Sequence, residues 1–295
     1  MAVSVFVSRV DAQVRGVYPL GMSATNSGVT PEMGFSYSNL PLYYARDRMT
    51  GANGETVATG AQSVFLDMNT IVWVSEKIGG LGGAKFSSAL TLPIAHNSLT
   101  SDPNGRISGA TGLGDVYIQP FILGWQGRRA DIRLIYGILA PTARFKAGAD
   151  DNLGSGYWTH VAASGQTFYL TEDKATNLST FEMYEIHRRQ EGTDVRPGDT
   201  FNLDYSLMHM FPAREGMRLQ LGLAGYVSWQ TSDKTGPSIT AEQAAARYRV
   251  NALGLASNVF LSERKLSFGF KYFKEFSSRS TFEGYSLQGS FAIKF

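Results

Sequence analysis

The sequence has no cysteine, little net charge and no long apolar run, and each absence excludes a class of protein. Without cysteine there can be no disulfide framework, no thiolate zinc site and no cysteine nucleophile. The 27 basic and 25 acidic residues leave a formal charge of +2, too balanced to indicate a nucleic-acid partner. No apolar stretch approaches the roughly 18 residues that a membrane-spanning helix needs, so a helical membrane protein is excluded. A transmembrane β-barrel is not excluded, because its strands carry only one alternating apolar face.

Alternation is clearest at the end of the chain, in residues 281–295. One face carries Tyr285, Leu287, Gly289, Phe291, Ile293 and Phe295, and the other carries Ser286, Gln288, Ser290, Ala292 and Lys294. A period of two predicts a strand. Because the chain stops on an aromatic residue of the apolar face, we expect this strand to close a sheet and its apolar face to contact lipid. The start of the chain lacks a basic stretch followed by an apolar core, so we interpret it as a mature start from which any signal peptide has been removed.

The rest of the chain divides into strands of similar length. With the last strand, the alternation predicts about twelve: 33–44, 61–76, 84–95, 113–125, 129–144, 157–170, 177–190, 200–211, 217–231, 248–262, 265–277 and 281–295. Strands of about ten to fifteen residues exceed the five or six usual in soluble sheets and suffice to cross a bilayer at a tilt. Long polar loops alternate with tight turns, as in outer-membrane barrels.

The predicted fold is therefore all-β, a transmembrane antiparallel up-and-down β-barrel formed by residues 30–295. Residues 1–29 show little periodicity and are expected to form an N-terminal segment tucked into or under the barrel. The alternative, a soluble β-sandwich or propeller, seldom sustains alternating long and short connections over so many long strands.

Charged residues in the strand centres indicate which face is inside. A Lys or Arg facing lipid at mid-membrane costs about 2 to 4 kcal/mol, so these charges are expected to face the lumen. The predicted lumen charge ladder consists of Asp67, Lys85, Asp115, Arg133, Glu185, Asp204, Lys271 and Glu275. We interpret its members, such as Asp115, Arg133 and Glu185, as structural ion pairs across strands. Glu182 has the outward parity, which predicts either a bulge or a position near the periplasmic rim.

The same inward parity predicts a lumen that is apolar in places. The predicted lumen-lining residues are Phe65, Trp73, Tyr117, Phe121, Ile135, Leu139, Met183, Met208, Tyr226 and Phe273. These side chains either form weak serial contacts for small aromatic or aliphatic solutes, or simply fill the interior of a narrow barrel. The pattern does not decide between the two.

Several sequence blocks resemble a known family. They are GLGDVYIQPFILGW (112–125), LAPTARF (139–145), NLGSGYWT (152–159), RPGDTFNLDY (196–205), GYVSWQTSDKTG (225–236) and KYFKEF (271–276), with a weaker match at YYARDRMTGANGE (43–55). In their order and spacing they are similar to the outer-membrane channel family associated with meta-pathway phenol degradation. The resemblance implies a monomeric twelve-stranded bacterial outer-membrane barrel that passes small hydrophobic molecules. It also implies that Phe295 is the aromatic end by which the barrel-assembly machinery recognises the chain.

Three other functions remain open: an outer-membrane enzyme acting on lipids, a general small-solute porin, and an adhesin or purely structural barrel. An enzyme would need Ser, His and a polar orienter to converge outside the barrel. Of the four histidines, His187 is predicted to face inward and His209 outward, so no catalytic residues are predicted. No cofactor is expected. Asp150 and Asp151 could hold a cation in a loop, but such loops more often stay metal-free, so no metal site is predicted. The expected partners are outer-membrane lipid and small hydrophobic solutes.

Overall fold

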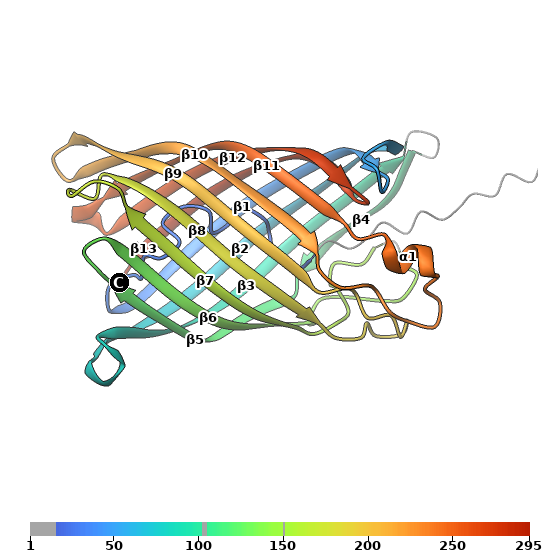
Figure 1. Ribbon diagram of the computed structural model, residues 1–295, viewed down its shortest axis with the longest axis horizontal. Coiled ribbons are helices and arrows are strands. Elements are labelled where there is room, and N and C mark those ends of the chain that lie inside the picture. The colour runs from blue at the N-terminus through green and yellow to red at the C-terminus, as the bar shows by residue number, and fades with distance from the viewer. Residues whose placement is uncertain (1–15, 102–104, 150) are drawn as a thin grey trace, which may run out of the picture.

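The computed structural model describes residues 16–101, 105–149 and 151–295, without the side chains of 99–109, and they form one closed antiparallel β-barrel (Figure 1). Its strands are β1 (Gly34–Thr50), β2 (Thr56–Ile78), β3 (Ala84–Ser101), β4 (Gly105–Leu113), β5 (Val116–Gln126), β6 (Ala130–Ala140), β7 (Thr159–Tyr169), β8 (Thr176–His187), β9 (Thr200–Arg214), β10 (Met217–Gln230), β11 (Arg249–Leu261), β12 (Leu266–Arg279) and β13 (Phe282–Lys294).

Apart from β4 and β5, strands that follow one another in the chain pair with each other, and β13 pairs with β1 to close the barrel. Both β4 and β5 pair with β3, because they are two halves of one wall strand interrupted at Gly114 and Asp115. At this break the Gly114 amide donates to the carbonyl of Pro93 at 2.8 Å. The twelve-stranded barrel predicted from the alternation is therefore confirmed.

The connections differ between the two ends of the barrel. One end, here the short-turn end, carries tight turns such as 215–216 and 262–265, together with the start of β1 and the C-terminus. The other, the long-loop end, carries the loops 141–158, 188–199 and 231–248. In the last of these, helix α1 (Ala241–Ala245) begins with a capping box between Thr240 and Gln243. The stretch 96–112, predicted to be a loop, is instead mostly strand, because β3 and β4 continue as a tall hairpin.

The outer face of the wall is aliphatic and aromatic. Leu134, Leu223 and Leu255 are 50%, 51% and 61% exposed, and Tyr285 and Leu287 of the last strand are exposed on the same side. The residues between them point inward and are mostly buried, many of them polar. Such a wall suits an apolar surrounding outside and a polar lumen inside. Among the described residues, no helix has the length and apolar character needed to span a membrane.

Residues 16–33 run inside the barrel without regular secondary structure, visible as the blue coil within the wall in Figure 1. This stretch, here called the inner segment, begins beside Glu185 near the long-loop end and reaches the short-turn end, where β1 begins. It fills much of the lumen. Residues 1–15 lie outside the described residues, and the division of the chain at residue 29 stays a prediction.

Candidate functional site

The inner segment is held by side chains of the barrel wall that bind its backbone. Asp204 of β9 makes the largest set of contacts, because its carboxylate accepts hydrogen bonds from the Gly21 amide at 3.0 Å, the Ser23 amide at 3.1 Å and the Tyr18 hydroxyl at 2.6 Å. Gly21 has a φ of +80°, and a Cβ there would lie 2.5 Å from the Phe273 ring, so glycine permits this close turn.

Glu185 and Lys271 also bind the backbone of the segment. The Glu185 carboxylate accepts the amides of Val17 at 3.1 Å and Tyr18 at 2.9 Å, and also the Thr200 hydroxyl at 2.6 Å. The Lys271 ammonium donates to the carbonyl of Gly21 at 2.8 Å. The two barrel charges therefore satisfy amides and carbonyls that an irregular backbone cannot pair within itself.

Polar contacts continue toward the short-turn end. Ser206 donates to the carbonyl of Ala24 at 2.7 Å, and Arg133 donates through Nε to the carbonyl of Ser27 at 2.7 Å. Lys85 donates to the carbonyl of Pro31 at 3.2 Å. The segment is thus anchored along its whole described length.

These contacts correct the interpretation of the charge ladder as ion pairs. Arg133, Glu185, Asp204 and Lys271 lie inside the barrel, where they hydrogen-bond to backbone groups of the inner segment. Among the described residues, no salt bridge joins any two of these four side chains. The sequence pattern could not indicate this, because backbone groups carry no side-chain signature.

Two further ladder members have different surroundings. Asp115, at the break between β4 and β5, accepts hydrogen bonds from the amides of Ala143 and Ser155 and so fixes the long loop 141–158. Glu275 accepts hydrogen bonds inside the barrel from Tyr44 and Tyr226.

The inward orientation predicted for Asp67 is wrong. Asp67 lies on the face of β2 opposite to Leu66 and Met68, which line the lumen. On the outer face it accepts a hydrogen bond from Asn39, whose amide also donates to Asn69 at 3.3 Å. These hydrogen bonds reduce the cost of a carboxylate on this face.

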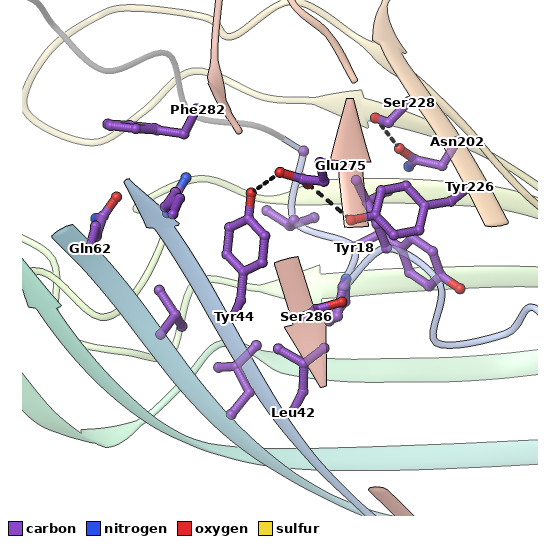
Figure 2. A pocket seen from close by; sticks show the side chains of 17 residues that line it. Tyr18, Leu42, Tyr44, Gln62, Asn202, Tyr226, Ser228, Glu275, Phe282 and Ser286 are labelled. Atoms are coloured by element: carbon purple, nitrogen blue, oxygen red, sulfur yellow. Dashed lines mark hydrogen bonds between the residues drawn. The ribbon is translucent and has the colours of Figure 1, made fainter. Parts of the chain in front are cut away.

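Two large cavities remain in the lumen beside the inner segment. Cavity 1, of about 380 Å³, lies between residues 16–20 and the long-loop halves of β1, β2, β9, β10, β12 and β13. Leu42, Val64 and Leu66 form its apolar side. Figure 2 shows Tyr44 and Tyr226 approaching the Glu275 carboxylate from two sides, at 2.6 and 2.9 Å.

Cavity 2, of about 480 Å³, lies on the other side of the inner segment, against β1–β3, β5, β6 and β8. Its lining is mainly apolar and includes Leu40, Met68, Pro93, Leu139 and Met183. Cavities 1 and 2 share the residues 16–19 and Leu66. A smaller cavity 3, of about 130 Å³, continues from cavity 2 toward Pro31 near the short-turn end, sharing Tyr18, Met22, Tyr117, Gln119 and Met183 with it. The three cavities thus follow the inner segment along the barrel.

Most residues predicted to line the lumen lie inside the barrel. Tyr117, Leu139 and Met183 line cavity 2, Ile135 lines cavity 3, and Tyr226 lines cavity 1. Met208 and Phe273 are fully buried in a cluster that contacts Leu20 of the inner segment. Whether any of them contacts a solute stays a prediction.

The inward orientation predicted for Phe65, Trp73 and Phe121 is wrong. They are 41%, 40% and 59% exposed on the outer face, where the Phe86 ring lies 6.1 Å from Trp73 and 6.2 Å from Phe121. In β5 the parity changes because the pairing shifts between Ile118 and Phe121. In β2 both faces are apolar, so alternation alone does not identify the inner one.

Glu182 faces outward in an uninterrupted stretch of β8, where it accepts a hydrogen bond from Ser164 at 2.8 Å. Neither the bulge nor the rim position predicted for it is found.

His187 is 1% exposed inside the barrel, whereas His209 is exposed on the outer face beside Thr176. The two histidines therefore do not converge, as predicted. Among the described residues, no group of three or more His, Asp or Glu side chains could hold a metal ion; Asp151 pairs with Arg144, and Asp150 lies outside the described residues.

The inner segment itself was missed as part of the site. Tyr18, Leu20 and Met22 contribute to the cavities or to the buried clusters around them, yet no periodicity distinguishes residues 16–33 from an ordinary loop. The wall residues Leu42 and Leu66, which line the cavities, have the inward parity of their strands and could have been found once one residue of each strand was oriented.

Comparison with known proteins identifies the family. The model of the family described as "Putative MetA-pathway of phenol degradation" matches residues 46–291. The chain belongs to this family. The resemblance noted in the sequence is thereby confirmed, and no curated protein matches the sequence.

Solved structures support the fold. An outer membrane channel from Pseudomonas putida F1 is similar with a TM-score of 0.73 and 13% identity, over 92% of this chain and 98% of that one. The beta domain of the Bordetella autotransporter Brka is similar with a TM-score of 0.55 and 12% identity, over 90% of this chain and 100% of that one. At these identities the likeness establishes the fold, which is that of an outer-membrane β-barrel.

Proposed function

We propose that this protein is a bacterial outer-membrane channel for the passive uptake of small hydrophobic or aromatic molecules of phenol or toluene size. The observation that carries the proposal is a lumen that is largely filled yet keeps two mainly apolar cavities, of about 380 and 480 Å³. Ligand pockets typically measure about 300 to 1,000 Å³, and an apolar cavity of about 150 Å³ already accepts benzene. Membership of a family named for phenol degradation and the fold of an outer membrane channel support the same substrate class.

The proposed route follows the inner segment. A solute enters cavity 1 or cavity 2 at the long-loop end and passes between them beside Leu66. It then moves past Tyr117 and Met183 into cavity 3 toward the short-turn end. Tyr117, Ile135, Leu139, Met183 and Tyr226 are the predicted wall contacts along this route.

A general porin is less well supported, because it would need an open and mainly polar path. The proposal includes no catalytic step and no cofactor. The protein acts as a monomer in outer-membrane lipid, and the barrel-assembly machinery recognises its C-terminal Phe295. Phe295 is 69% exposed and donates its amide to the carbonyl of Phe35 at 3.0 Å, so its side chain is accessible at the short-turn end.

Uptake of toluene and of a sugar into proteoliposomes tests the proposal. We expect toluene to enter vesicles that contain the protein faster than it enters empty vesicles. Sugar should enter both kinds of vesicle at the same rate. Replacing Leu66 by Trp should reduce toluene uptake to the level of empty vesicles, because this side chain lines both large cavities. The matched control is Phe65→Trp, one residue away on the outer face, which should leave uptake unchanged. Free passage of sugar, or toluene entry no faster than in empty vesicles, would contradict the channel proposed here.

A further inference from the structure

Methionines gather around cavity 2. Of the nine methionines in the chain, Met22, Met68 and Met183 line this cavity, and they come from the inner segment, β2 and β8. Met68 is 6% and Met183 is 2% exposed, so the surrounding structure holds both side chains in place. The described lining of cavity 1, by contrast, contains no methionine. A thioether sulfur makes a favourable contact with an aromatic ring about 5 Å away, and this contact has no counterpart for a saturated ring.

An aromatic side chain completes the same cavity. Tyr117 lines cavity 2 from β5, and its ring lies across the backbone of Gly137 in the neighbouring strand β6. A Cβ on Gly137 would lie 2.6 Å from the Tyr117 ring, so only glycine leaves room for this placement. The ring is therefore kept close to the wall, and the space in front of it stays open.

Several polar side chains around cavity 2 already have partners within the protein. Thr70 and Thr91 share a hydrogen bond of 2.8 Å across β2 and β3. Asp115 accepts the amides of Ala143 and Ser155 at 3.0 and 2.7 Å. The remaining lining is dominated by aliphatic side chains, thioethers and Pro93. A neutral ring fits such a site without leaving these polar groups unpaired.

We propose that cavity 2 binds the ring of a neutral aromatic solute and prefers it to a saturated ring of similar size. Met22, Met68 and Met183 contact the ring through sulfur, and Tyr117 offers it an edge or a face. The inference rests on the proposed function, because it assigns the selective step of uptake to one part of the same lumen. Cavity 1, which lacks the thioethers, discriminates less.

Fluorobenzene and fluorocyclohexane form a matched pair of probes, because they differ in aromaticity and each carries one fluorine. Their binding to the full chain in lipid nanodiscs can be followed by fluorine NMR, with empty nanodiscs subtracted. We expect the wild-type protein to bind fluorobenzene more tightly. In the double variant Met68→Leu, Met183→Leu this preference should fall by about twofold to tenfold, while fluorocyclohexane binding stays constant. Leucine is nearly isosteric with methionine, so the cavity keeps its volume and apolar character.

Two further variants make the result specific. Met33→Leu removes a thioether that is 50% exposed and lines none of the three cavities, so it should leave the preference unchanged. Gly137→Ala should weaken fluorobenzene binding, because the new Cβ displaces the Tyr117 ring into the cavity. The heat-dependent shift of barrel mobility in SDS gels checks that each variant is folded.

The outcomes separate this inference from the proposed function. Equal binding of both probes by the wild-type protein, or an unchanged preference in the folded double variant, would overturn the ring site even if toluene uptake is normal. A ring preference that depends on the two methionines supports the site even if proteoliposomes take up no toluene, in which case the channel proposal alone fails.

Discussion

The inner segment makes different contacts with the two sides of the lumen wall. On β8–β13, polar and charged side chains such as Glu185, Asp204, Lys271 and Gln288 reach its backbone at hydrogen-bond distance. On β1–β3, the lumen-facing centre is mostly apolar, with Leu40, Leu42, Leu66 and Met68. Beside the large cavities the segment is anchored to the first side, here the polar wall, and these cavities open against the second, here the apolar wall.

This difference indicates that the two walls have separate roles. An irregular segment inside a barrel must have its amides and carbonyls satisfied by neighbours, since unpaired buried polar groups cost about 1 to 3 kcal/mol each. The polar wall supplies those partners. The apolar wall supplies none at the cavities, so a hydrophobic solute can lie there without displacing a hydrogen bond.

The largest expected effect comes from removing the inner segment. A chain that begins at Gly34 keeps every strand but loses the segment that fills the lumen. We expect single-channel conductance in planar bilayers to rise well above that of the full chain, and sugars to enter proteoliposomes freely. Both walls would then line one wide pore, and the selectivity for hydrophobic solutes would disappear. Unchanged conductance in a folded barrel would show that the segment is not what narrows the pore.

A smaller effect is expected from Asp204→Ala on the polar wall. The change removes the acceptor for three groups of the inner segment and leaves Lys271 without the nearby carboxylate. A buried polar group left without its partner costs about 1 to 3 kcal/mol, so the thermal unfolding temperature should fall and the segment should become cleavable by protease.

The control for this variant is Asp67→Ala, which removes a carboxylate from the outer face of the wall. Asp67 bonds Asn39 and does not contact the inner segment in the described structure. We expect its loss to leave the segment protected from protease. Equal cleavage in both variants would mean that the barrel loosens as a whole and that Asp204 is no specific anchor.

Sequence alternation predicted the barrel but only part of the lumen. Alternation is a strong signal for the strands of a barrel, because a one-residue shift in the pairing would move every side chain of a strand to the opposite face. Ile135 and Met183 were therefore oriented correctly. Phe121 was not, because a shift in the pairing of β5 reverses the parity just before it. Phe65 and Trp73 were misassigned because β2 carries large apolar residues on both faces.

The inner segment could not be predicted in detail for a different reason. Its position depends on hydrogen bonds from wall side chains to its backbone, such as Arg133 to the carbonyl of Ser27. Backbone carbonyls are the same in every residue, so the sequence of 16–33 contains no pattern that indicates which wall side chains bind it. The inward charges of the wall were visible in the sequence, but they were interpreted as pairing with one another.

The smallest expected effect concerns two neighbouring residues on the boundary between the walls. Gln288 of β13 and Leu42 of β1 are paired across the closing strands, and they belong to the polar and the apolar wall respectively. Gln288 donates to the carbonyl of Leu20 at 2.8 Å, whereas Leu42 lines cavity 1. Replacing each by Met introduces the same side chain on either side of the boundary.

Gln288→Met should weaken the attachment of the inner segment by about 1 kcal/mol, the usual net value of one neutral hydrogen bond. Hydrogen exchange at the amides around Leu20 should then be about fivefold faster, because the local opening becomes more favourable by that amount. Leu42→Met conserves volume and removes no hydrogen bond, so exchange there should stay at the wild-type rate. Faster exchange in both variants would mean that the apolar wall also anchors the segment. The distinction between a wall that anchors the segment and a wall that faces the solute would then be wrong at this boundary.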